Sequence, residues 1–119
     1  LAPPARAAAA GILRDALEAT AREYRRRAGE TSGHRAEVLA ATAAIAADPQ
    51  LAEDAATAIR SRGLTPERAV WEAIGRTAEQ YRAAGGELLD RITDLNDVRD
   101  RVISRLTGVE PPGLPERRE

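Results

Sequence analysis

The stretch that decides the fold is Leu88–Gly108, which reads LLDRITDLNDVRDRVISRLTG. Its apolar residues recur at spacings of three and four, so that a helix places them on one stripe: Ile92, Leu95, Val98, Val102 and Leu106. Charged residues occupy the opposite side of that helix. Gly108 is typical of a left-handed C-cap, and Pro111 and Pro112 prevent the helix from resuming. The stretch predicts one amphipathic helix, whose stripe other helices must cover.

The chain before this stretch supplies such helices. Arg6–Arg27 carries an apolar stripe with alanines filling the gaps, which predicts a first helix. Two glycines and two hydroxyl residues within 29–33 predict a turn, with Ser32 as a possible N-cap. A second helix is expected over His34–Ala47. The two segments together predict a helical hairpin.

Two proline pairs mark the next helix starts. Asp48-Pro49 combines a strong N-cap with the residue favoured at the first helical position, so we expect a kink and a new segment, Pro49–Arg62, which Gly63 ends. Thr65-Pro66 repeats the device and predicts a helix to Ala84. The two glycines at 85–86 then predict a corner before the final helix.

These segments predict an all-α fold. We expect a four-helix bundle of two antiparallel hairpins, with the second helix kinked at Asp48-Pro49. No useful run of alternating apolar residues favours a strand. We expect residues 1–5 to be a lead-in, residues 6–108 to form the helical domain, and residues 109–119 to be a linker or tail.

The composition of the 119 residues excludes several classes of protein. A net charge of −1 and 3% aromatic residues give no reason to expect nucleic acid as a partner. Cysteine is absent, and no apolar run approaches the roughly 18–20 residues of a membrane span. Residues 1–4 do not resemble a signal peptide. We expect a cytoplasmic protein, and the missing initiator methionine suggests a piece of a longer one.

No residue pattern predicts catalysis by this segment alone. His34 is the one histidine, and its place beside a glycine-bounded turn predicts an exposed residue at a helix start, with phosphorylation or metal binding as the rarer reading. No glycine pair is followed by the Lys-Ser/Thr of a phosphate-binding loop. The carboxylates alternate with arginines on solvent faces, an ordinary surface pattern. We expect no catalytic residue, metal or cofactor here.

Two residues are candidates for surface contacts. Trp71 lies on the apolar stripe of its helix, so we expect it in the core, with an exposed docking anchor as the alternative. Arg91 either pairs with Glu87 four residues earlier or contacts a partner, since arginine is enriched at binding hot spots. The residues alone favour the pairing.

Five landmarks carry a resemblance to a known family. They are AGET at 28–31, DPxL at 48–51, PERAV at 66–70, RxxDLxDVxxRVI at 91–103 with LxG at 106–108, and GVxxPG at 108–113. In this order and spacing they resemble the helical subdomain of enzyme I. Enzyme I is the phosphoenolpyruvate–protein phosphotransferase of the bacterial sugar phosphotransferase system.

The resemblance implies a role in docking. In that family the helical insert binds the histidine phosphocarrier protein, HPr, while the phosphorylated histidine lies in a neighbouring subdomain. Phosphoenolpyruvate and magnesium bind a further domain of the parent enzyme. The resemblance thus implies that this chain binds an HPr-type phosphocarrier, adjoins the remaining domains of its parent and is not catalytic by itself.

The resemblance also implies contact residues. Arg91 falls on the family arginine that contacts the phosphocarrier, and Leu88 and Ile45 fall on apolar contact positions. The remaining implied contacts lie around the kink: Thr42, Ala44, Asp48 and Gln50. Thr42 and Ala44 are smaller than the residues that the family usually carries there.

Two other classes stay open at this point. One is a helical interaction or oligomerisation module without a phosphotransferase partner. The other is a small DNA-binding regulator, with a helix–turn–helix placed on Thr57–Ile74. Glu67 and Glu72 argue against it, because they would start the recognition helix with negative charge.

Overall fold

Helices make up nearly all of the described part of the chain. The computed structural model describes residues 2–108, and within them we find no strand. The helices are α1 Pro3–Gly29, α2 Gly33–Ala46, α3 Pro49–Arg62, α4 Pro66–Ala84, α5 Glu87–Asp90 and α6 Ile92–Thr107. The predicted all-α class is confirmed. The tail predicted at 109–119 lies outside the described residues.

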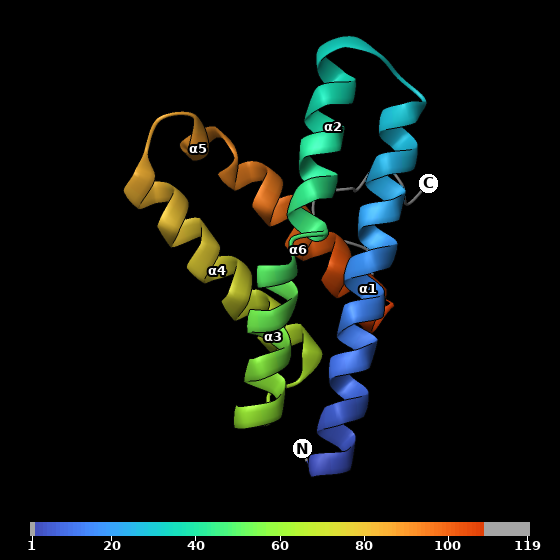
Figure 1. Cartoon of the computed structure of the whole chain (residues 1–119), viewed down its shortest axis with the longest axis vertical. Helices are drawn as coiled ribbons and strands as arrows, with labels where there is room; N and C mark the ends of the chain where they lie inside the picture. Colours follow the sequence, from blue (N-terminus) through green and yellow to red (C-terminus); the bar gives the residue numbers. More distant parts are fainter. Residues whose placement is uncertain (1, 109–119) are drawn as a thin grey trace.

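The helices pair as two hairpins. Figure 1 shows α2 and α3 following one another alongside α1, and α4 and α6 joined through α5 at one end. The second pair packs on the first mainly where α4 meets α3 and where α6 meets α1. The predicted bundle of two hairpins is therefore confirmed, with α5 as an extra turn between α4 and α6.

The core lies where the apolar stripes of the two hairpins meet. Its largest side chains are fully buried: Leu13, Ile59, Val70, Ile74, Leu95, Val98 and Val102. Buried alanines such as Ala55, Ala56 and Ala69 fill the space between them. Because alanine adds little beyond the backbone, the helices approach one another closely with few bulky residues. The last helix, α6, supplies three of the large core side chains: Leu95, Val98 and Val102.

The break between α2 and α3 is built from local chemistry. Asp48 Oδ1 accepts a hydrogen bond from the backbone N–H of Gln50 at 2.9 Å, and Pro49 occupies the first turn of α3. At the other end of α3, Gly63 takes the left-handed conformation at φ 69°. The predicted kink and both predicted ends of α3 are confirmed. The predicted start of α4 is confirmed too, because the Thr65 hydroxyl caps this helix by accepting a hydrogen bond from the Arg68 N–H.

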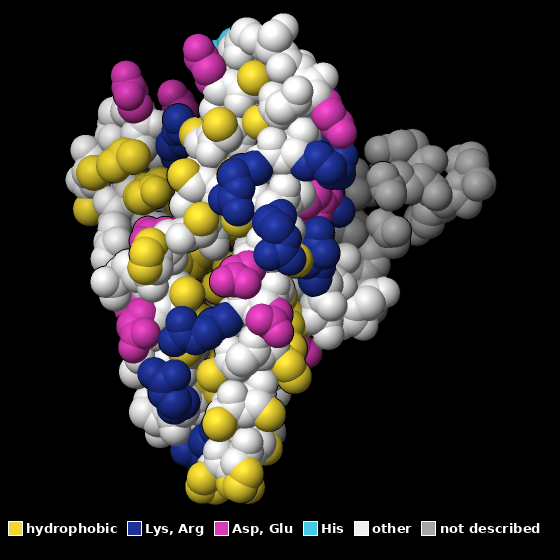
Figure 2. Space-filling model, turned by 45° about the vertical axis from the view of Figure 1, so that its right-hand side comes forward, with side chains coloured by type: hydrophobic (Ala, Val, Ile, Leu, Met, Phe, Trp, Pro, Cys, Tyr) yellow, Lys and Arg dark blue, Asp and Glu magenta, His cyan; other side chains and the backbone are white. Residues whose placement is uncertain are grey.

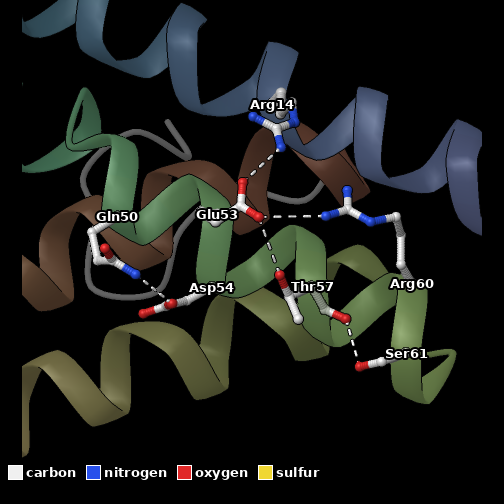
Figure 3. Close-up of polar contacts among 7 residues, drawn as sticks. All are labelled: Arg14, Gln50, Glu53, Asp54, Thr57, Arg60 and Ser61. Atoms are coloured by element: carbon white, nitrogen blue, oxygen red, sulfur yellow. Dashed lines mark hydrogen bonds and ion pairs between the residues drawn. The ribbon is translucent and has the colours of Figure 1, made fainter.

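Polar contacts fix α3 against α1 after the break. Figure 3 shows Glu53 of α3 facing Arg14 of α1 and Arg60, which lies about two turns further along α3. Its carboxylate oxygens lie 3.4 Å from Arg14 Nη2 and 3.5 Å from Arg60 Nη2. The Thr57 hydroxyl donates to the same carboxylate at 3.4 Å. Since these groups are exposed, the network orients α3 more than it stabilises the fold.

Two helix boundaries differ from the predictions. Helix α1 begins at Pro3 and not at Arg6, because proline suits the first turn, where no N–H donor is needed. The predicted single helix over 88–108 is wrong, since it divides at Arg91, where ψ is −7°. The Arg91 N–H donates to the Leu88 carbonyl at 3.1 Å, a three-residue turn. None of the α5 residues is buried, whereas α6 buries Leu95, Val98 and Val102.

Candidate functional site

A hollow opens where α2, α4 and α5 meet. It has a volume of about 250 Å³, and we call it the α2–α5 hollow. Its lining residues come from three separated parts of the chain: Ala41, Ala44, Ile45 and Asp48 at the end of α2, Tyr81 near the end of α4, and Leu88 and Arg91 around α5. The fold thus brings both helix breaks, at Asp48 and at Arg91, to one surface.

The floor of the α2–α5 hollow is apolar and shallow. Ala44 is exposed, and Leu88 is 38% exposed although it is a large apolar side chain. Its neighbour Leu89 is also exposed. Of the four exposed large apolar residues in the described chain, these two lie on the same four-residue helix. Exposed apolar residues that gather in this way are typical of an interaction surface.

Two opposite charges stand at the rim of the hollow. Asp48 uses one carboxylate oxygen to cap α3. Arg91 Nη1 lies 3.5 Å from Asp94 Oδ2. Among the described residues Arg91 therefore pairs with Asp94 and not, as the sequence had predicted, with Glu87. Asp94, the partner of Arg91, lies three positions later, in the first turn of α6. The hollow is therefore lined by one acid and one base in addition to its apolar side chains.

The structure gathers five of the seven residues that the sequence placed at a partner surface. Ala44, Ile45, Asp48, Leu88 and Arg91 all line the α2–α5 hollow. Thr42 is only 3% exposed, and its hydroxyl donates to the Val38 carbonyl of its own helix at 2.9 Å. Gln50 is exposed, but its amide donates to Asp54 on α3 at 2.8 Å. Neither residue lines the hollow.

Sequence reasoning missed two lining residues. Ala41 lies one helical turn before Ala44, and that spacing is the signal that would have found it. Tyr81 lies three residues after the buried Ala78 of α4, is only half-buried and borders the hollow. The apolar spacing of a helix does not tell which side chains at the edge of its apolar stripe remain exposed to solvent.

A second surface differs from its prediction. Trp71 was expected in the core and is 49% exposed, because the buried stripe of α4 runs through Val70 and Ile74. The Arg99 guanidinium covers one side of its ring at 4.4 Å from the ring centre. A hollow of about 380 Å³ adjoins the ring; its lining residues are Thr65, Glu67, Arg68, Trp71 and Ile103. We call it the Trp71 hollow.

The described residues contain few features of other site types. No group of three or more metal-binding side chains occurs within residues 2–108. His34 is exposed as predicted, with Glu37 as its nearest carboxylate at 3.9 Å. Within the same range no helix is long and apolar enough to cross a bilayer. Figure 2 shows basic side chains along the middle of one face, with acidic side chains among and beside them.

Comparison with known proteins identifies the family. The family of the N-terminal part of PEP-utilising enzymes matches residues 2–91, which include all seven residues that line the α2–α5 hollow. The chain belongs to this family. The resemblance to enzyme I, drawn from the sequence landmarks, is thereby confirmed.

Named relatives agree with the family. A phosphoenolpyruvate–protein phosphotransferase of Streptomyces coelicolor is 40% identical over 106 residues, which cover 89% of this chain and 19% of the relative. One from Haloferax volcanii is 40% identical over 72 residues, 58% of this chain and 13% of the relative. The chain thus corresponds to the N-terminal domain of such enzymes and spans under a fifth of their length.

A solved structure shares the PEP-utiliser fold. An Enzyme I protein determined in solution by NMR superposes with a TM-score of 0.79 at 29% identity. The match covers 91% of this chain and 46% of that protein. The helical arrangement described above is therefore the helical part of an Enzyme I N-terminal fold.

Proposed function

We propose that this chain is the docking domain of a phosphoenolpyruvate–protein phosphotransferase and that it binds an HPr-type phosphocarrier at the α2–α5 hollow. The observation that carries the proposal is the convergence of Leu88, Ile45 and Arg91 on one open apolar surface. Ile45 lies more than forty residues before Leu88 and Arg91 in the sequence, and the family resemblance named all three as contact positions.

The shape of the α2–α5 hollow supports a transient encounter. Its floor is small and shallow, and its rim carries one acid and one base, so a partner makes few deep contacts there. A carrier that leaves after each phosphoryl transfer needs an interface on the order of 1,200 Å² or less. In this proposal the phosphorylated histidine, phosphoenolpyruvate and magnesium belong to other parts of the parent enzyme. The chain itself supplies recognition.

A titration tests where the carrier binds. The chain, labelled with ¹⁵N, is titrated with the phosphocarrier from the same organism while backbone amide shifts are followed. We expect shifts confined to residues 42–51 and 87–95, which surround the hollow. Shifts clustered on residues 6–27, or no binding at millimolar concentration, would contradict the proposal.

Arg91→Ala gives the sharpest variant. Arginine at a hot spot contributes more than about 1 kcal/mol, so we expect carrier binding to weaken by at least that amount. Stability should change by less than about 0.5 kcal/mol, because Arg91 is not buried. Arg76→Ala is the matched control, since Arg76 is an exposed arginine of α4 that does not line the hollow. Equal binding by the two variants would contradict the assignment.

One observation favours an oligomerisation module as the second candidate function. The Trp71 hollow carries an exposed aromatic side chain, and none of its lining residues lines the α2–α5 hollow. Trp71 is the one tryptophan of the chain, so its fluorescence reports on this surface alone. Self-association would shift the emission to the blue as protein concentration rises. Emission that stays constant with concentration would rule out association through Trp71.

A further inference from the structure

The rim residue Arg91 forms an ion pair with a residue that does not line the α2–α5 hollow. Arg91 sits between α5 and α6, and its guanidinium reaches over the first turn of α6 to Asp94. Arg91 Nη1 and Asp94 Oδ2 are 3.5 Å apart. The Arg91 side chain is 39% exposed, whereas the Asp94 side chain is 18% exposed. The acid is therefore the more enclosed member of the pair.

We propose that Asp94 is the positioning residue that holds the Arg91 guanidinium at the rim of the α2–α5 hollow, ready for an acceptor group of the phosphocarrier. The inference rests on the proposed docking function and adds a residue to it. Asp94 does not line the hollow and touches no partner in this scheme. It acts through Arg91.

The local structure explains why Asp94 is the fixed member. Asp94 lies in the first turn of α6, where the partial positive charge of the helix start favours a carboxylate. Its low exposure reduces screening by water, so its attraction for the guanidinium exceeds that of an open surface acid. Asp90 and Glu87 precede Arg91 on α5, and both are exposed. Among the described residues neither forms an ion pair with Arg91.

The geometry favours orientation over competition for the arginine. A guanidinium carries five N–H donors in a planar fork, and Asp94 is approached by Nη1. The donors on Nη2 and Nε stay available to a partner. A long side chain that is already held loses less conformational freedom on binding, which corresponds to about a two- to tenfold gain in affinity. Holding Arg91 in advance therefore strengthens the complex.

A double-mutant cycle on the chain tests the inference. The variants are Asp94→Asn, Arg91→Ala and the two combined, with carrier affinity measured for each. We expect Asp94→Asn to weaken binding about two- to tenfold, the range that the side-chain ordering term gives. In the Arg91→Ala background the same change should have no effect, because there is no guanidinium left to hold. Asp94→Glu, which keeps the charge, should restore most of the affinity.

Asp90→Asn is the matched control, because it removes a neighbouring negative charge that forms no ion pair among the described residues. A merely structural role of Asp94 would weaken binding equally with and without Arg91, and that result overturns the inference. So does tighter binding by Asp94→Asn, which indicates competition. If Arg91→Ala weakens binding and Asp94→Asn does not, docking stands and the positioning role fails. If neither changes the affinity of a carrier that binds, the proposed surface itself fails.

The free chain gives an independent measurement. The Nε–Hε signal of Arg91 in an NMR spectrum reports on the order of its side chain without any carrier. We expect Asp94→Asn to lower that order, and Asp90→Asn to leave it unchanged. An Arg91 side chain that is equally mobile in all three proteins overturns the inference, whether or not a carrier binds.

Discussion

The α2–α5 hollow lies between two helix breaks that are built in different ways. At the first, the Asp48 carboxylate caps α3 at 2.9 Å and Pro49 starts the new helix. At the second, Arg91 stands between α5 and α6 without a side-chain cap hydrogen bond. Its support comes from Asp94 on the next turn and from Leu95, which is fully buried below.

The first break is specified by residues next to it in the sequence, whereas the second depends on how the two helices pack. Capping residues and proline act over three or four positions, so the first break needs little from the rest of the fold. The second break forms because α6 is anchored in the core while α5 buries no residue. We therefore expect the two breaks to respond to different mutations, with the larger losses at the second.

Leu95→Ala should have the largest effect. Leu95 is 0% exposed, and truncating a buried leucine leaves a cavity that costs about 2–5 kcal/mol. Urea unfolding followed by far-UV circular dichroism measures the loss. Leu89→Ala removes an exposed leucine of α5 and should cost less than about 0.5 kcal/mol. Similar losses for the two variants would show that α5 is packed as firmly as α6.

Asp48→Ala should have an intermediate effect. The change removes the carboxylate that accepts from the Gln50 N–H, and loss of such a cap costs about 0.5–2 kcal/mol. The same urea experiment measures it. Asp90→Ala at the second break is the control, because Asp90 is exposed and caps no helix. If Asp48→Ala is no more destabilising than Asp90→Ala, the first break is not held by its cap.

The same contrast explains which parts of the fold the sequence predicts. The bounds of α3 and α4 follow from Pro49, Gly63 and Pro66, whose effects on the backbone are local. The division at Arg91 has no such signal, since the apolar spacing continues through it. Whether a turn such as α5 stays in line with the next helix depends on burial, which spacing alone does not give.

The candidate surface divides in a similar way. Five residues transferred from the family resemblance lie together in the hollow, because the fold is shared. Thr42 is buried and Trp71 is exposed, each against expectation. Both lie at the edge of an apolar stripe, where a shift of one residue turns a side chain by about 100° around the helix and decides its burial. Whether a side chain at such an edge position is buried depends on the helices that pack beside it.

Acidic groups also differ on the two sides of the hollow. After the first break, Glu53 faces the two arginines Arg14 and Arg60. After the second, α6 carries Asp97 near two other carboxylates. Desolvation raises the pKa of Asp97 above its ordinary value, and the charges of Asp94 and Asp100 raise it further, while Arg101 lowers it. The charged form of Asp97 is thus disfavoured in the folded state.

Asp97→Asn should give the smallest effect, and a stabilising one. The folded state holds the Asp97 proton more strongly than the unfolded state, so stability falls as pH rises from the unfolded-state pKa through the raised folded-state pKa. At pH 7 the neutral amide removes this penalty, with a gain below about 0.5 kcal/mol because water screens the site. Below the unfolded-state pKa the gain should vanish. Thermal unfolding across this pH range measures the effect, with Asp15→Asn on α1 as the control. A lower stability of Asp97→Asn than of the unmutated protein at neutral pH would contradict the argument.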